Sequence, residues 1–226
     1  PIVGPRHPGA PTEFPGTGDA GFHVNVGTGI YSGNDAQTDL SIADNAIGTT
    51  IYAPTHMPKY SCLEATTAHY RYSGHTYTVH GHGWYDHCNG TGFGYSMEWM
   101  DSAWKAKYVR TDSGEERFWI TILKSDSTWY GYLYNFNLGQ WEQKRYISGS
   151  SSYEQGWTMW ESYGLMDELQ LCPNFPGIRS ANVNIYDNGW RELTSNDTDP
   201  LGPDGLCWDN STYTFDVHQA NYDWHA

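Results

Sequence analysis

The sequence predicts an all-β protein, a two-sheet antiparallel β-sandwich of the jelly-roll or concanavalin-like kind. About ten segments alternate apolar and polar residues with period two, which is typical of strands that bury one face. Short turns rich in Gly, Ser, Asp and Asn separate them. No amphipathic pattern is long enough to predict a helix. Aromatic residues make up 16% of the chain, and Tyr and Trp favour strands.

The expected strands run from residue 22 to residue 217. Phe22, Val24 and Val26 share one face of the first strand, 22–26, and Phe118, Ile120 and Ile122 share one face of a later strand. The full set after the first is expected at 39–42, 49–52, 63–72, 76–84, 94–99, 106–110, 118–123, 129–136, 143–147, 158–163, 181–186 and 213–217. Residues 1–20, rich in Pro and Gly, are expected to form a flexible arm, and residues 21–226 a single domain with a polar, loop-rich tail from Asn196.

Charge and composition exclude several classes of function. The net charge is −14, so neither nucleic acid nor an anionic membrane surface is an expected partner. Mean hydropathy is −0.67, and no stretch approaches the ~20 apolar residues of a membrane-spanning helix. The four cysteines form no C-x-x-C pair, which favours two disulfides in a secreted protein, with Cys62–Cys88 and Cys172–Cys207 as the preferred pairing of three.

Glu161, a glutamate flanked by aromatic residues, is the first candidate for a catalytic residue. If 156–164 is a strand, Glu161 shares a face with Trp157, Met159 and Tyr163. Burial among apolar side chains raises the pKa of a carboxyl group, and such tuning is common in general acids and bases. The alternative is a solvated glutamate on an edge strand.

Two further patterns each have two interpretations. His80 and His82 would lie on one face of a strand, a spacing that lets two imidazoles share a metal, with His69, Asp86 or His87 as a third ligand. They can equally be surface histidines near a strand end. An aromatic stripe, consisting of Tyr130, Tyr132, Tyr134 and Phe136, suits either core packing or stacking on sugar rings.

Paired carboxyl groups are the remaining route to catalysis. Glu64, Glu98, Asp101 and Glu161 lie on or near aromatic-flanked strands, where two carboxyl groups could share a proton and activate a water, for a peptide or a glycosidic bond. Solvated positions are the alternative for Glu98 and Asp101.

The chain resembles the neprosin-type glutamic peptidase domain over about residues 21–217. The similarity lies in six stretches: Thr50-Ile51-Tyr52-Ala53-Pro54, Tyr60-Ser61-Cys62-Leu63-Glu64, Thr78 to Trp84, Phe118 to Asp126 with Trp129-Tyr130, Trp157 to Gly164, and Ser180 to Asp187 followed by Leu206-Cys207-Trp208-Asp209. The resemblance implies a secreted β-sandwich in which two glutamates activate water for peptide hydrolysis in acid. Related fungal glutamic peptidases pair a glutamine with a glutamate.

Residue by residue, the resemblance places the second family glutamate at Glu161. The first precedes Ala-Gly-Trp in the family, and Gly81 stands at that position here. Glu64 is the expected substitute, and His80 or His82 the second choice. Substrate contacts are expected from Trp84, Trp157, Tyr163 and Tyr132, and no cofactor is expected.

The sequence therefore predicts a secreted, acid-acting hydrolase whose substrate is a polypeptide. Two other functions stay open. One is a non-catalytic module that binds a glycan through Tyr130, Tyr132 and Tyr134, and the other is a metal site at His80 and His82.

Overall fold

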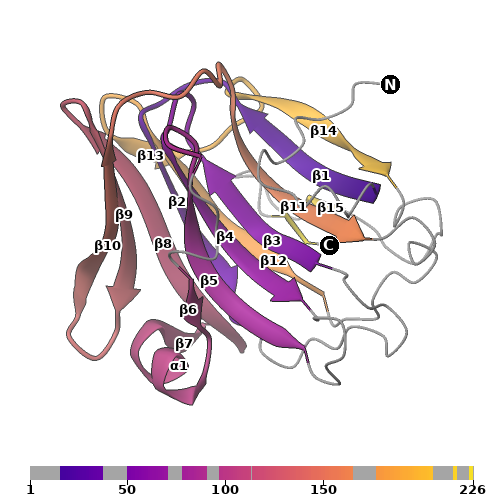
Figure 1. The fold of residues 1–226 in the computed structure, drawn as a ribbon, viewed down its shortest axis with the longest axis vertical. Coiled ribbons are helices and arrows are strands. Elements are labelled where there is room, and N and C mark those ends of the chain that lie inside the picture. Colours follow the sequence, from indigo (N-terminus) through magenta and orange to yellow (C-terminus); the bar gives the residue numbers. More distant parts are fainter. Residues whose placement is uncertain are drawn as a thin grey trace.

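Two antiparallel sheets pack face to face in the computed structural model, as the sequence predicts (Figure 1). The structure describes residues 16–37, 50–70, 78–90, 97–112, 114–164, 177–205, 216–217 and 224–225. The first sheet has seven strands, in the order β14 (Thr198–Gly205), β1 (Gly16–Val24), β11 (Gly156–Gly164), β3 (Thr50–Met57), β4 (Leu63–Tyr70), β5 (Val79–Asp86) and β6 (Glu98–Trp99).

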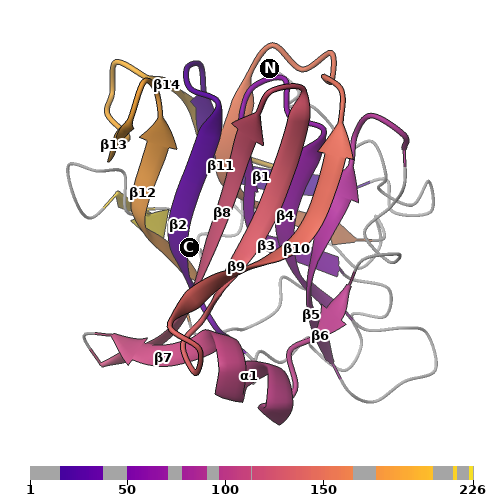
Figure 2. The ribbon, with the colours of Figure 1, turned by 90° about the vertical axis from the view of Figure 1, so that its left-hand side faces the viewer.

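The second sheet has nine strands and forms the layer that faces the viewer in Figure 2. Its main path runs β10 (Gln140–Ser148), β9 (Thr128–Asn135), β8 (Glu115–Ser125), β2 (Gly29–Asp35), β12 (Arg179–Tyr186), β16 (Trp224–His225) and β15 (Asp216–Val217). Two short strands lie off this path: β13 (Trp190–Glu192) pairs with β12, and β7 (Val109–Asp112) pairs with β8.

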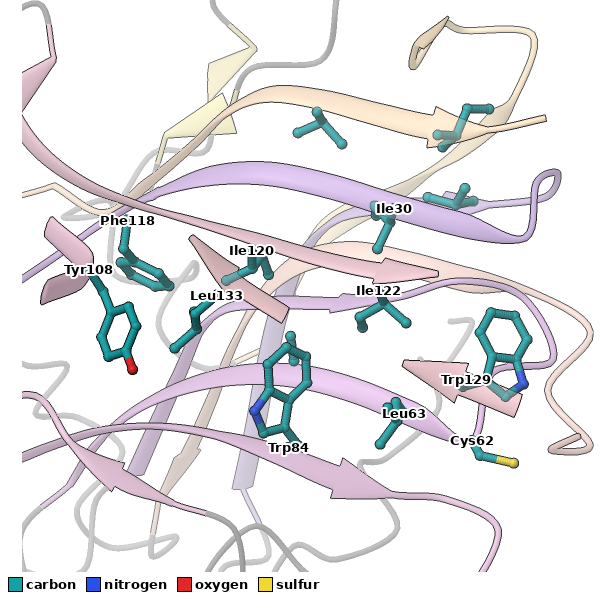
Figure 3. Packing of buried hydrophobic residues seen from close by; sticks show 14 of the residues in the cluster. Ile30, Cys62, Leu63, Trp84, Tyr108, Phe118, Ile120, Ile122, Trp129 and Leu133 are labelled. Carbon is teal, nitrogen blue, oxygen red and sulfur yellow. The ribbon is translucent and has the colours of Figure 1, made fainter. Parts of the chain in front are cut away.

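The core between the sheets follows from the period-two pattern of the strands. Phe118, Ile120 and Ile122 of β8 are fully buried against Leu63 and Trp84 of the first sheet (Figure 3). Alternate residues of β9 also point inward, including Trp129 and Leu133. Its tyrosines, Tyr130, Tyr132 and Tyr134, are half-buried on the opposite side. The aromatic stripe therefore lies on the outer face of the second sheet and not in the core.

One helix was not predicted. Helix α1 (Ser102–Tyr108) begins after Asp101, whose carboxylate accepts a hydrogen bond from the Trp104 backbone N–H at 2.8 Å. This is the N-cap arrangement that satisfies a free amide at the start of a helix. The helix is too short to show a helical period in the sequence, and it replaces the first part of the strand expected at 106–110.

Several other strands differ from the prediction, among them β1, β2 and β14. Strand β1 begins at Gly16, within the expected arm, and β2 was not predicted because its segment, GIYSGND, has few apolar residues. Strand β14 occupies part of the tail that was expected to be a loop. Its prolines are tolerated because β14 is the edge strand of this sheet among the described residues, so it needs no amide donors on the side away from β1.

A disulfide joins Cys62 to Cys88, as the sequence predicts, and ties the start of β4 to the turn after β5. The expected Cys172–Cys207 pair, the expected strand at 39–42 and residues 1–15 lie outside the described residues. Within the described part of the chain, no helix has the length and apolarity needed to cross a membrane.

Candidate functional site

Glu161 lies on the face of the first sheet that points away from the second sheet, and we call this face the Glu161 face. Its neighbours along β11, Trp157 and Met159, form a small apolar cluster with Met57, separate from the main core. Thr158 points the other way, because its hydroxyl accepts a hydrogen bond from Trp224 Nε1 of the second sheet at 3.0 Å. The alternation predicted for this strand is thus confirmed. The Glu161 side chain is 3% exposed, so the solvated alternative is wrong.

Strand register places Glu161 in a row of residues that crosses the sheet. From β14 to β5 the row consists of Asp204, Asp19, Glu161, Tyr52, Ala68 and Gly81. Residues directly opposite one another in antiparallel strands belong to the same face. Two acidic positions therefore follow Glu161 in register on one side, on the neighbouring strands β1 and β14. The sequence analysis missed them because it placed both segments outside the sheet.

Gly81 lies on the other side of Glu161 in this row, with Trp99 of β6 beyond it. It is three strands from Glu161, about 14 Å between Cα atoms at the usual strand spacing. A Cβ built on Gly81 would meet Sδ of Met97 and would be 2.6 Å from its Cγ. The Met97 side chain thus fills the space that a side chain at position 81 would need. The position that the family resemblance assigns to a glutamate is occupied here by a glycine and a covering methionine.

Glu64 lies on the Glu161 face, but not opposite Glu161. It is four residues along β4 from Ala68, which puts its Cα about 16 Å from that of Glu161 by strand geometry. Its Oε2 is 2.5 Å from Nε2 of His87, and its Oε1 accepts a hydrogen bond from Trp157 Nε1 at 3.2 Å. The side chains of Glu64 and His87 are both fully buried. Glu64 is therefore tied to β11 through an indole.

Aromatic rings surround the Glu64–His87 pair. Tyr85, Tyr153 and Trp157 have ring centroids 4.6, 5.1 and 5.8 Å from that of His87. Burial raises the pKa of Tyr153, and the charges of Glu64, Tyr85 and Glu161 raise it further. Both glutamates thus act electrostatically on one phenol. Trp157 is 2% exposed, so its indole supports this cluster and offers little open surface to a substrate.

Two of the expected site residues, Trp84 and Tyr132, lie away from the Glu161 face. Trp84 is in the core between the sheets, against Gly131, where no substrate has access. Tyr132 is on the outer face of the second sheet. Tyr163 lies two residues beyond Glu161 in β11, and its side chain is outside what the structure describes.

The two histidines do not act as a pair. His82 is 1% exposed and packs on Phe118 and Trp84 in the core, where burial lowers its pKa to about 3. Nδ1 of His80 instead lies 2.7 Å from Nδ1 of His69. Among the residues that the structure describes, no group of three His, Cys, Asp or Glu side chains is placed to hold a metal. Since His82 faces the core, it cannot serve as the partner of Glu161.

The remaining carboxyl candidates have structural roles. Glu98 accepts a hydrogen bond from Trp104 Nε1 at 3.1 Å and forms an ion pair with Lys144 at 2.6 Å. Asp101 caps α1. Neither of these contacts lies on the Glu161 face, so Glu161 and Glu64 are the buried glutamates on that face, beside the register positions Asp19 and Asp204.

Comparison with solved structures identifies the fold. Two crystal structures of scytalidoglutamic peptidase match the chain, one with a peptide-based transition-state analogue and one with a transition-state-analogue inhibitor. Each is 12% identical with a TM-score of 0.52, and the matches cover 93% and 92% of this chain and 96% and 97% of the peptidase. No protein-family model matches the sequence, and no curated protein matches it. The chain therefore has the fold of a glutamic peptidase.

Proposed function

We propose that this protein is a secreted, acid-acting peptidase in which Glu161 activates water. The observation that carries the proposal is a buried glutamate in the middle of one face of a glutamic-peptidase fold. A buried carboxyl group is a common general base or acid because burial changes the cost of ionising it. The scytalidoglutamic peptidase structures, which contain transition-state analogues, support a peptide as the substrate class.

In the proposed reaction, the Glu161 carboxylate takes a proton from a water molecule, and the resulting hydroxide attacks the peptide carbonyl carbon. The C–N bond then breaks as the nitrogen accepts a proton, which releases an amine and a carboxylic acid. A second acid group must stabilise the oxyanion or protonate the nitrogen. Because Gly81 has no side chain, this group has to come from another position in the sheet.

Two residues are candidates for the second acid. Glu64 is the choice that the sequence analysis made, and its bonds to His87 and Trp157 hold it on the Glu161 face. Asp19 is nearer in register, since it is directly opposite Glu161 on β1. Two neighbouring carboxyl groups share a proton most readily in acid, which favours activity below neutral pH.

The test is cleavage of a denatured protein between pH 2 and pH 6 by the wild type and by four single variants. Glu161→Gln should lose about a hundredfold or more in rate. Glu154→Gln is the matched control, because Glu154 is an exposed glutamate just before β11, and it should keep the wild-type rate. Equal cleavage by Glu161→Gln and wild type would end the proposal.

The other two variants identify the partner. If Asp19→Asn alone loses as much rate as Glu161→Gln, the second acid is on β1. If Glu64→Gln alone loses as much, the second acid is on β4.

Secretion is supported by the Cys62–Cys88 disulfide, since such bonds persist in oxidising compartments. Recovery of the protein in the cytosolic fraction of its native source would contradict secretion.

A further inference from the structure

The outer face of the second sheet carries a groove lined by aromatic side chains. The hollow has a volume of about 500 Å³, within the range of small-ligand sites. Its lining comes from every strand between β10 and β13, and consists of Tyr31, Thr121, Leu123, Tyr132, Trp141, Asn184 and Trp190, which together we call the aromatic groove. It therefore crosses the width of the sheet, whose strands lie side by side in Figure 2.

Two indoles line the aromatic groove, Trp141 from β10 and Trp190 from β13. They are 38% and 45% exposed, which is unusual for so large an apolar side chain. The rings of Tyr31 and Tyr134 hold Trp141 edge-on, with centroids 5.9 and 5.2 Å away. Tyr186 supports Trp190 in the same way at 5.4 Å. Both indoles are thus braced with part of their surface open to solvent.

The lining combines rings with uncharged polar groups. Thr121 and Asn184 lie between the aromatic positions, and no lining residue is an acid or a base. Burial raises the pKa of Tyr31 to about 12 and also raises the pKa of Tyr132, so both phenols stay protonated and can donate hydrogen bonds. In a chain with a net charge of −14, an uncharged groove without a cation does not suit an anionic ligand.

We propose that the aromatic groove binds a chain of neutral pyranose sugars. A pyranose ring presents a face of C–H groups, which stack on the electron-rich face of an indole, and a rim of hydroxyl groups, which pair with hydroxyls and amides. The groove offers both, with the indoles of Trp141 and Trp190 as stacking surfaces and Thr121, Asn184 and the phenols as polar groups. Thr121 Oγ1 also donates to the Ile30 carbonyl at 3.0 Å, and Asn184 Nδ2 donates to the Asn182 carbonyl at 2.6 Å. The sugar hydroxyls would therefore pair chiefly with the phenols of Tyr31 and Tyr132 and with the amide oxygen of Asn184.

This site is independent of the proposed peptidase site. The two lie on opposite outer faces of the sandwich, with the core between them. Tyr132, which the sequence analysis assigned to a peptide substrate, belongs instead to the aromatic groove. A protein with both sites would bind a glycan on the outer face of the second sheet and cleave a peptide on the Glu161 face.

Titration of intrinsic tryptophan fluorescence and calorimetry with cellohexaose, xylohexaose, mannohexaose and chitohexaose tests the proposal on the full chain. At least one hexasaccharide should bind the wild type. Trp141→Ala and Trp190→Ala should each weaken that binding about three- to tenfold, and Trp141→Phe, which keeps a stacking ring, should weaken it less. Trp99→Ala is the control, since Trp99 is 51% exposed but lies on β6 of the first sheet.

Three results would overturn the proposal: no binding of any hexasaccharide, equal binding by Trp141→Ala, Trp190→Ala and wild type, or self-association that Trp141→Ala abolishes. The last would assign the groove to a second copy of the chain. Hydrolysis of a soluble peptide should not change in either groove variant, so failure here leaves the peptidase proposal to its own test.

Discussion

Asp197→Asn is expected to destabilise the protein at neutral pH but not at pH 2. Asp197 lies between β13 and β14 and is 4% exposed. Its carboxylate accepts two hydrogen bonds of 2.7 Å from Arg191, and two from Thr194, at 3.0 Å from the backbone N–H and 2.7 Å from the hydroxyl. The bonds from Arg191, followed by those from Thr194, lower the pKa of Asp197 from 3.8 to about 2.

The pKa difference sets the size of the effect. A shift from 3.8 to about 2 is 1.8 units, and at 1.36 kcal/mol per unit it corresponds to at most about 2.4 kcal/mol. Arg191 is 39% exposed, so solvent screens part of this interaction. We therefore expect Asp197→Asn to lose about 1 to 2 kcal/mol of unfolding free energy at pH 6.5, or about 2 to 8 °C in Tm for a chain of this length.

The pH dependence follows from the direction of the shift. A carboxyl group whose pKa is lower in the folded state stabilises the fold above its unfolded pKa, and the benefit disappears as the pH falls through the folded pKa. The difference between wild type and Asp197→Asn should be constant above pH 5, shrink between pH 4 and pH 2, and vanish below pH 2. Urea unfolding of both proteins at pH 6.5, 4.0 and 2.0 measures this difference in unfolding free energy.

Asp187→Asn is the control for this experiment. Asp187 also bonds to Arg191, at 3.2 Å, but 41% of its side chain is exposed, so the loss should stay below about 0.5 kcal/mol. A difference for Asp197→Asn that is the same at pH 2.0 and pH 6.5 would refute the reasoning, because the charge would then not be its cause. The prediction also bears on function, since Asp197 directly precedes β14, and its ion pair should persist through most of the proposed working range.

Three other predictions concern the core, the disulfide and position 81. Gly131→Ala should cost about 1 to 3 kcal/mol in thermal unfolding, because its Cβ would lie 2.6 to 2.9 Å from the Trp84 ring, whereas Gly33→Ala, with neighbours at 3.5 Å or more, should cost much less; equal losses would contradict the packing argument. Replacing Cys62 and Cys88 by Ala should lower the unfolding free energy in urea by about 3 to 4 kcal/mol, since the bond closes a loop of 26 residues, and no change would argue against loop entropy as the cause. Gly81→Glu combined with Met97→Ala should leave the kcat/KM of peptide hydrolysis in acid about equal to that of Met97→Ala alone, because the second acid is proposed at another position, and a rise of about tenfold would assign the partner to position 81.

The sequence was sufficient to predict strands that bury one face. In β8, Phe118, Ile120 and Ile122 alternate with half-buried and polar residues, and the structure buries all three. The same rule identified the face of Glu161 in β11. It failed where burial was not periodic, as in β2, or where prolines conceal an edge strand, as in β14. Helix α1 left a local signal in its Asp101 cap, but seven residues are too few to reveal a helical period.

The surroundings of Glu161 could not be predicted in the same way. Which residues lie beside it depends on the pairing of β11 with β1 and β3, strands more than a hundred residues away in the chain. Alternation gives the face of a residue but not its register against a distant strand. Residue type was equally ambiguous: Trp84 and Trp141 are both indoles on strands, yet one packs in the core and the other opens onto solvent.

Gly81 and Met97 bear on where the second acid is to be sought. A glutamate at position 81 would approach Glu161 from the β5 end of the row, but the Met97 side chain fills that space and covers Gly81 with apolar atoms. The acidic positions of the row lie instead at its other end, on β1 and β14. If Glu161 is catalytic, this arrangement favours a partner from the β1 side, and the Asp19→Asn and Gly81→Glu variants test the two ends of the row separately.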